Sequence, residues 1–203
     1  MSPTYLACMT ANIPNAEPDR IPRVGFQGSY GAFSEQAIRQ HWPHGADARP
    51  HHTFSDVIAS VLARHVDFAV IPVENAIAGK VVNALDALDA AGDGIVRRTD
   101  LRINVKLCLL GPKGATLEGV RMVHSHPMAL AQCRIFFARH GWFTPVPHED
   151  TAGAAEDVAA WNDVTIAAIA SDAAADRHGL EIIVRHVEDV PANWTRFLVV
   201  TAR

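Results

Sequence analysis

A hydroxyl and a permanent cation stand side by side near the end of the chain. Thr195 and Arg196 follow Asn193-Trp194 and open an apolar segment, Phe197-Leu198-Val199-Val200. A guanidinium can hold a carboxylate through two parallel hydrogen bonds, and a neighbouring hydroxyl can donate to a departing oxygen. The pair therefore predicts an anionic substrate that loses an oxygen. A structural explanation stays open, because Thr often begins strands and Arg often covers apolar surface with its stem.

A glycine-rich turn between Gly25 and Ser34 leads from an apolar strand into a helix. Glycines let the backbone N–H groups of a helix N-terminus approach an anion, so Gly31 and Ala32 are candidate contacts of the substrate. The spacing is not G-x-G-x-x-G, and no acidic residue follows about 20 positions later, so a dinucleotide site is not expected. A tight turn without a ligand is the alternative.

Two further loops place polar residues after apolar strands. Glu74-Asn75-Ala76 ends the first strand; Asn75 can donate and accept, and Glu74 fits a helix cap better than a catalytic acid. Ser125-His126-Pro127 ends the second and opens a helix that carries Gln132. Because Ser125 and Gln132 are seven residues apart, a continuous helix would direct both into one cleft, although capping alone also explains Ser125.

The composition excludes several classes of protein. The 203 residues are 49% hydrophobic with a formal charge of −4, which allows a buried core in one domain or two lobes. The 18 Lys and Arg residues are scattered, so no nucleic-acid partner is expected. The apolar runs are shorter than the roughly 20 residues of a membrane helix, and the first 20 residues lack a secretory pattern. Three cysteines without paired spacing suit a reducing compartment, so a cytoplasmic protein is expected.

Strands and helices alternate after a proline-rich tail at residues 1–22. The first half predicts strands at 23–26, 48–52 and 67–71, helices at 31–41, 54–64 and 79–91, and an extended stretch at 95–110. The second half predicts strands at 120–123, 142–146, 164–170, 181–186 and 195–200 and helices at 127–140, 151–160 and 171–177. This alternation predicts an α/β fold with two mostly parallel sheets, whose ligands bind beyond the carboxyl ends of the strands.

Taken in order, these motifs closely resemble the prephenate dehydratase family. The resemblance covers about Arg23 to Ala202 and rests on the turn ending at Ser34, Pro72-Val73-Glu74-Asn75, Cys108–Pro112, Ser125-His126-Pro127 with Gln132-Cys133, Thr151–Ala155, Ala167–Ser171 and Thr195-Arg196-Phe197. It implies two lobes similar to type 2 periplasmic binding proteins, with the active site in the cleft between them. Lobe 1 would comprise about residues 23–101 and 180–203, and lobe 2 about 102–179, with crossings near Leu101 and Leu180.

The resemblance also implies an activity: the decarboxylating dehydration of prephenate to phenylpyruvate in phenylalanine biosynthesis, by a carbon–oxygen lyase without a cofactor. Thr195 would donate to the leaving oxygen and Arg196 would bind a carboxylate. We predict that this is the pyruvyl carboxylate, because clamping the ring carboxylate would oppose its loss. The implied substrate-binding residues are Asn75, Ser125, Gln132, Phe197, Glu74, Ala76, Gly31 and Ala32. A homodimer is the expected assembly.

The chain departs from the family pattern in three places. Ala76 replaces a residue that usually carries a hydroxyl, and Met128 replaces a usual Gln, so substrate affinity and choice, including acceptance of arogenate, are not fixed by the motifs. The regulatory ACT module commonly fused behind the catalytic part has no counterpart before Arg203, so regulation through it is not expected.

Three features of the sequence or the resemblance allow a different interpretation of the site or the activity. Eleven histidines suggest a metal site, but His51 and His52 would point to opposite faces of a strand and no Cys or carboxylate cluster accompanies them, so no metal is expected. A non-aromatising prephenate decarboxylase would keep the carboxylate clamp without protonating the hydroxyl. A two-lobed module that binds small anions without turnover is the remaining possibility.

Overall fold

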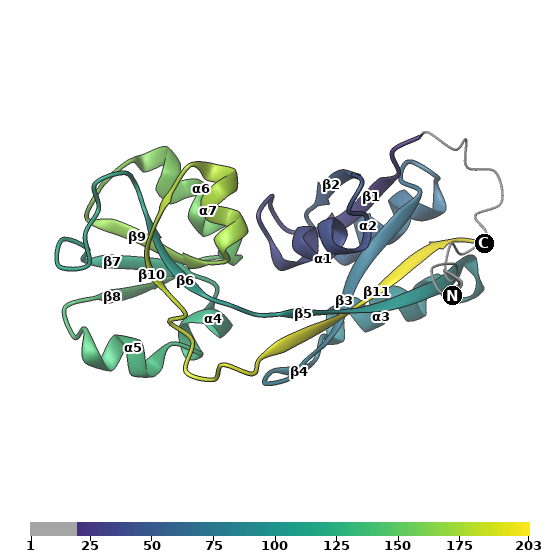
Figure 1. The fold of residues 1–203 in the computed structure, drawn as a ribbon. Helices are drawn as coiled ribbons and strands as arrows, with labels where there is room; N and C mark the ends of the chain where they lie inside the picture. The colour runs from purple at the N-terminus through teal and green to yellow at the C-terminus, as the bar shows by residue number, and fades with distance from the viewer. Residues whose placement is uncertain (1–19) are drawn as a thin grey trace, which may run out of the picture.

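A computed structural model describes residues 20–203, which form two α/β lobes (Figure 1). The expected tail at residues 1–22 lies outside the described residues except for its last three, and so does Cys8. Within the described part, every helix falls short of the length and apolarity needed to cross a bilayer. The predicted two-sheet α/β fold is confirmed.

The first lobe is built on a six-stranded sheet with the order β2-β1-β3-β11-β5, in which β4 also pairs with β3. Its strands are β1 (Arg23–Gln27), β2 (Asp47–His51), β3 (Phe68–Asn75), β4 (Gly79–Lys80), β5 (Ile95–Asn104) and β11 (Trp194–Ala202). Its helices are α1 (Phe33–His41), α2 (Phe54–Leu62) and α3 (Val82–Ala91), followed by the 3₁₀ turn η1 (Gly92–Gly94). The lobe is discontinuous in sequence because β11 comes from the end of the chain.

The second lobe is built on a five-stranded sheet with the order β10-β6-β9-β7-β8. Its strands are β6 (Cys108–Gly111), β7 (Met122–Ser125), β8 (Thr144–Pro147), β9 (Ile166–Ala170) and β10 (Glu181–Arg185). Its helices are α4 (Pro127–Ala131), α5 (Arg134–Arg139), α6 (Thr151–Trp161) and α7 (Asp172–His178).

Both sheets are mixed rather than mostly parallel. β1 pairs in parallel with β2 and β3, and β7 does so with β8 and β9, but the other five pairings are antiparallel. Four of the antiparallel pairs involve the strands beside the two connections, β5, β6, β10 and β11, and the fifth joins β3 to β4.

Apolar side chains cover both faces of the first sheet. Along β11, Phe197 and Val199 enter one buried cluster with Phe26, whereas Leu198 and Val200 enter the cluster on the opposite face. This alternation follows from the period of two in a strand. It also fixes which side chains of the preceding Asn193–Arg196 segment share a face with Phe197.

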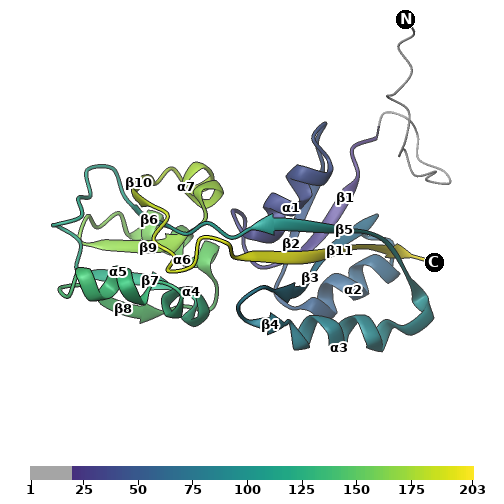
Figure 2. The same ribbon diagram turned by 60° about the horizontal axis from the view of Figure 1, so that its bottom comes forward.

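Two connections join the lobes, at residues 105–107 and 186–193. Figures 1 and 2 show them side by side, and Val105 N–H donates to the carbonyl of Asn193 at 2.9 Å. The expected boundaries near Leu101 and Leu180 are displaced, because β5 continues in the first sheet to Asn104 and β10 pairs with β6 in the second.

The predicted helix over 127–140 is two short helices. The segment that returns to the first lobe interrupts it, because the carboxylate of Asp189 accepts the backbone N–H groups of Arg134 and Ile135 at 3.0 and 2.9 Å. Asp189 N–H in turn donates to the carbonyl of Gln132 at 2.6 Å. Gln132 therefore ends α4 instead of lying inside a long helix.

Candidate active site

A cavity of about 400 Å³ lies between the lobes, a size suited to a small molecule. The first lobe contributes side chains from β3, β11 and the start of α1, and the second contributes side chains from α4 and the start of α6; the connections complete the wall. The lining residues are Gln27, Gly28, Ala32, Phe33, Ser34, Phe54, Pro72, Asn75, Ala78, Val81, Val105, Leu107, His126, Met128, Ala129, Gln132, Glu149, Asp150, Thr151, Asn193, Thr195 and Phe197. The cavity therefore has both apolar side chains and a group of polar side chains in its wall.

A β-bulge sets the polar end of this cavity. Thr195 pairs with Asn75 and Phe197 pairs with Pro72, so the register between β11 and β3 skips Val73. Pro72 and Asn75 are three residues apart, yet both line the cavity. A regular strand would not present both on one face, because its side chains alternate. The bulge thus brings Asn75 beside Thr195.

Thr195 accepts a hydrogen bond that leaves its own hydrogen free. Asn75 Nδ2 lies 3.0 Å from Thr195 Oγ1, and the Oδ1 of Asn75 is occupied by the backbone N–H groups of Ile77 and Ala78 at 3.0 and 2.9 Å. Since these backbone groups can only donate, the Asn75 carboxamide has a defined orientation and its Nδ2 must be the donor toward Thr195. The hydroxyl hydrogen of Thr195 is then available to a ligand.

Gln132 reaches the same polar cluster from the second lobe. Asn193, which is 1% exposed, donates from Nδ2 to Gln132 Oε1 at 2.8 Å, and Asn193 Oδ1 accepts from Asn75 Nδ2 at 3.0 Å. The structure therefore brings together three of the sequence-predicted residues, Thr195, Asn75 and Gln132, through a fourth that was not assigned a role.

Backbone N–H groups and one histidine can donate hydrogen bonds in the cavity. No Arg or Lys occurs among its lining residues within 20–203. Ala32, Phe33 and Ser34 form the start of α1, whose N-cap makes no side-chain hydrogen bond, so its N–H groups can donate to an anion. The carboxylate of Glu35 lies in the same turn and already accepts Gly31 N–H at 2.6 Å. His126 accepts the N–H of Met128 at Nδ1, 3.2 Å away, which places the hydrogen of the neutral ring on Nε2. The backbone N–H groups of α1 and the Nε2–H of His126 can thus both donate to a carboxylate.

Arg196 does not line this cavity. It lies between Thr195 and Phe197, which both do, and the alternation of β11 turns its side chain away. Its guanidinium pairs with Glu74 at 3.1 Å and with Asp100 at 3.2 Å. The hydrogen bond to Asp100 and, more weakly, that to Glu74 raise the pKa of Arg196 above its usual value. Arg196 and Glu74, both predicted to contact the substrate, therefore pair with each other outside the lining of this cavity.

Ser125 is also directed away from the cavity. It is the last residue of β7, it is fully buried, and its hydroxyl donates to the carbonyl of Ile169 on the neighbouring β9. Ser125 does not share a helix face with Gln132, as their spacing predicted, because Ser125 precedes α4 and Gln132 ends that short helix. Ser125 fixes the end of β7 against β9.

The glycine-rich turn serves two purposes. Ala32 lines the cavity, whereas Gly31 packs against the second lobe with φ +91°; a Cβ added there would lie 2.7 Å from Ala174 Cα. Ser171 Oγ donates to the Gly31 carbonyl at 2.7 Å, so this contact docks α7 against the turn. Ala76 lies outside the lining, and its N–H donates to the carbonyl of Trp194 at 2.9 Å. Gly31 and Ala76 therefore hold the elements that carry the site.

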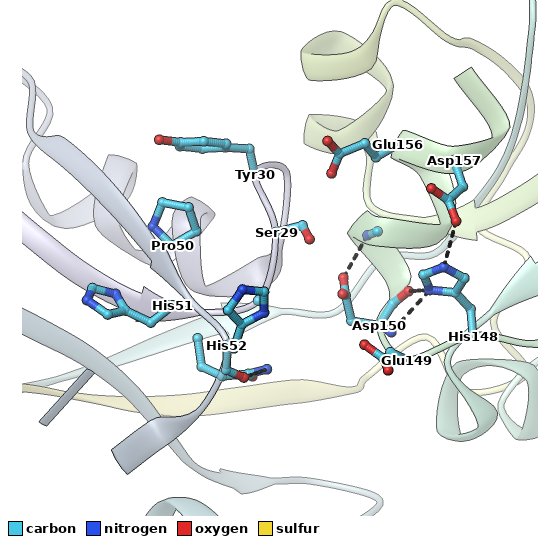
Figure 3. Close-up of a pocket in the computed structure, with 13 residues that line it drawn as sticks. Ser29, Tyr30, Pro50, His51, His52, His148, Glu149, Asp150, Glu156 and Asp157 are labelled. Carbon is cyan, nitrogen blue, oxygen red and sulfur yellow. Dashed lines mark hydrogen bonds and ion pairs between the residues drawn. The ribbon is translucent and has the colours of Figure 1, made fainter. Parts of the chain in front are cut away.

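A second hollow, of about 570 Å³, adjoins the first and shares Gln27, Gly28, Glu149 and Asp150 with it. Figure 3 shows His51 and His52 on one side and His148, Glu156 and Asp157 on the other. His148 Nε2 lies 3.1 Å from Asp157 Oδ2. Within residues 20–203, no group of three or more His, Cys, Asp or Glu side chains could hold a metal ion.

The comparison with protein families agrees with this arrangement. The sequence model of the prephenate dehydratase family matches residues 24–203, which is most of the chain. The chain belongs to the prephenate dehydratase family.

Relatives within the family share 35 to 42% of aligned residues with this chain. A bifunctional N-acyl-homoserine lactone acylase/prephenate dehydratase from Komagataeibacter europaeus is 42% identical over 89% of this chain and 63% of its own length. A bifunctional chorismate mutase/prephenate dehydratase from Neisseria gonorrhoeae is 35% identical over 89% of this chain and 50% of its own length. The chain thus spans about half to two thirds of these relatives.

Solved structures of the family have the same fold. A prephenate dehydratase from Arthrobacter aurescens in complex with L-Phe superposes with a TM-score of 0.81 at 27% identity, covering 89% of this chain and 60% of its own. The enzyme from Staphylococcus aureus gives a TM-score of 0.74 at 26% identity, covering 89% and 66%. The two lobes are therefore a family property.

Among the lining residues that were not predicted as site residues, His126 and Asn193 carry polar groups that could bind or position a ligand. His126 lies inside the Ser125-His126-Pro127 motif, from which only Ser125 was predicted as a site residue. Asn193 is two residues before Thr195, and the period of two in a strand already placed Asn193, Thr195 and Phe197 on one face. That signal was present in the sequence and could have found Asn193.

Proposed function

We propose that this protein is a prephenate dehydratase: a carbon–oxygen lyase that converts prephenate to phenylpyruvate, carbon dioxide and water in phenylalanine biosynthesis, without a cofactor. The observation that carries the proposal is the Thr195 hydroxyl, which accepts from Asn75 and keeps its hydrogen for a ligand in the cavity. A dehydratase needs a donor of this kind at the departing oxygen.

The reaction breaks two bonds that join the substrate ring to its substituents. The bond between the ring and its carboxylate breaks, carbon dioxide leaves, and the electron pair moves into the ring; the bond to the ring hydroxyl then breaks and the oxygen leaves with a proton as water. Thr195 is a very weak acid, so its part is a strong hydrogen bond to the oxygen as negative charge develops there, with a water relay supplying the proton.

Several of the remaining lining groups suit the other parts of prephenate. The uncapped start of α1 and the donors of Gln132 and His126 suit the pyruvyl carboxylate. Apolar side chains of Phe33, Phe197 and Leu107 suit the ring, which becomes aromatic in the product. Arg196 has no part in this arrangement, because its charge is used by Glu74 and Asp100.

One assay tests the proposal against its two alternatives. Purified protein is incubated with prephenate, and phenylpyruvate and carbon dioxide are measured together. Equal amounts of both products support the dehydratase. Carbon dioxide without phenylpyruvate identifies a non-aromatising decarboxylase, and binding without either product identifies a binding module. Arogenate is the second substrate to assay, because related enzymes are named arogenate dehydratase/prephenate dehydratase.

We also propose a cytoplasmic homodimer. Its cytoplasmic location is supported by the biosynthetic role proposed here. Light scattering behind a sizing column measures the assembly: a mass of about twice 22.0 kDa is expected, and a mass near 22.0 kDa contradicts the dimer. Fractionation of the source cells tests the location.

A further inference from the structure

Asn193, at the end of the connection 186–193, contacts both the other connection and the polar cluster that contains Thr195. Its carbonyl accepts the N–H of Val105 from the other connection at 2.9 Å. Its side chain is 1% exposed and bridges Asn75 in the first lobe to Gln132 in the second. A buried carboxamide that is hydrogen-bonded at both ends has little freedom to turn.

The orientation of every amide in this cluster follows from two backbone groups. Ile77 and Ala78 N–H can only donate, so they fix Asn75 Oδ1 as the acceptor and Asn75 Nδ2 as the donor. Asn193 must then present Oδ1 to Asn75 and Nδ2 to Gln132. Gln132 in turn accepts at Oε1, which leaves the two hydrogens of its Nε2 for the cavity that it lines.

We infer that Asn193 is a positioning residue that keeps two donors from different lobes, Thr195 Oγ1–H and Gln132 Nε2–H, directed into the same cavity. This inference rests on the proposed function. Without the bridge, Asn75 Nδ2 loses one of its three acceptors, so its alignment on Thr195 is less tightly held. Gln132 Oε1 loses its donor, so the Gln132 amide can rotate and turn its oxygen toward an anionic substrate. Asn193 acts only through Asn75, Thr195 and Gln132 and has no direct role in bond breaking.

The test replaces the carboxamide by an apolar side chain of similar shape. Asn193→Leu should lower kcat at least about tenfold and raise KM by a smaller factor, of about threefold, because the Thr195 donor matters most in the transition state whereas Gln132 binds the substrate in both states. Asn193→Ser, which is smaller and cannot span both partners, should show the same split if the leucine variant folds poorly. Asn104→Leu is the matched control: Asn104 is exposed and lies opposite Trp194 on β5, and its kcat should stay within twofold.

Combination with Thr195→Ala separates positioning from general stabilisation. If Asn193 acts through Thr195, adding Asn193→Leu to Thr195→Ala should lower kcat by less than about threefold further, since coupled residues are not additive. Full multiplication of the two losses, or a wild-type kcat in both Asn193 variants, overturns the inference.

A spectroscopic readout keeps this result distinct from the proposed function. The side-chain amide signals of Asn75 and Gln132 in a ¹H–¹⁵N spectrum should both move in Asn193→Leu and stay in place in Asn104→Leu. Signals that do not respond to Asn193→Leu contradict the bridge. Absence of phenylpyruvate formation by the wild-type protein contradicts the proposed function instead, while the spectrum still reports whether the bridge exists.

Discussion

At the scale of single residues, neighbouring positions of the Thr195-Arg196-Phe197 motif have opposite surroundings. Thr195 and Phe197 line the cavity, whereas Arg196 is paired with Glu74 and Asp100. The motif therefore combines a donor for the ligand with an ion-pair network that ties β11 to β3 and β5. The two kinds of residue should respond differently to substitution.

Removal of the Thr195 hydroxyl should chiefly affect the chemical step. Thr195→Ala should lower kcat at least about a hundredfold and leave KM nearly unchanged, because the lost hydrogen bond is strongest as the oxygen departs. Steady-state kinetics with prephenate measure this. Thr195→Ser keeps the hydroxyl and serves as the control. An alanine variant within a few-fold of wild type would remove Thr195 from the mechanism.

Arg196 should affect stability more than binding. Arg196→Met should lower the free energy of unfolding by about 1 kcal/mol, since its two ion pairs are partly exposed. KM should change less than about threefold, because the guanidinium does not line the cavity. Denaturant unfolding and kinetics check the two values. A tenfold rise in KM at unchanged stability would show that Arg196 binds the substrate.

At the scale of elements, the site depends on local departures from regular structure. The bulge at Val73 brings Asn75 to Thr195, and the break between α4 and α5 places Gln132 at a helix end beside the returning connection. The turn before α1 approaches α7 so closely that Gly31 leaves no room for a Cβ. These irregularities place side chains that regular strands and helices would direct elsewhere.

Gly31→Ala should test the contact between the turn and α7. Its φ is +91° and the added Cβ would lie 2.7 Å from Ala174 Cα, so about 2 kcal/mol or more of stability should be lost to strain and overpacking. Gly114→Ala is the matched control, because Gly114 has a φ of +87° and nothing within 4 Å of the added Cβ. Equal losses in the two variants, measured by chemical unfolding, would show that the contact with α7 is unimportant.

At the scale of the whole molecule, a charge cluster anchors the start of the described chain to the first sheet. Asp67 pairs with Arg20 at 2.6 Å and with Arg23 at 2.9 Å. Partial burial by itself raises the pKa of Asp67, but the hydrogen bonds from Arg23 and Arg20 outweigh it and hold the pKa well below its usual value. The stability of the fold should therefore depend on pH through this carboxylate.

Asp67→Asn should destabilise the protein at neutral pH and much less in acid. The folded-state pKa lies below that of the unfolded chain, so the carboxylate stabilises the fold above about pH 4 and this contribution is lost as the pH falls. The melting temperature of the variant should be several degrees lower at pH 7, and the difference should shrink on acidification. Asp93→Asn is the control, because Asp93 is fully exposed. A difference independent of pH would contradict the assignment.

The sequence by itself determined the order of elements, the family and five of the residues that line the cavity: Ala32, Asn75, Gln132, Thr195 and Phe197. Apolar strands alternating with helices predicted two α/β sheets, because this periodicity reports directly which faces are buried. The motifs gave Asn75, Gln132 and Thr195, which the structure brings into one polar cluster. The order of elements is local along the chain, so the apolar period reveals it, whereas the roles of these three residues were implied by the resemblance to the family.

Only the tertiary structure decided which of the motif residues face the cavity. The direction of Arg196 and Ser125, the mixed strand order and the break after Gln132 depend on partners distant in sequence: Asp100, Ile169, β11 and Asp189. The period of two along β11 shows that Asn193, Thr195 and Phe197 share one face of the strand, but it does not show which face of the strand meets the other lobe. The pairing of the two connections, which buries Asn193 between Asn75 and Gln132, decides which face of β11 meets the other lobe.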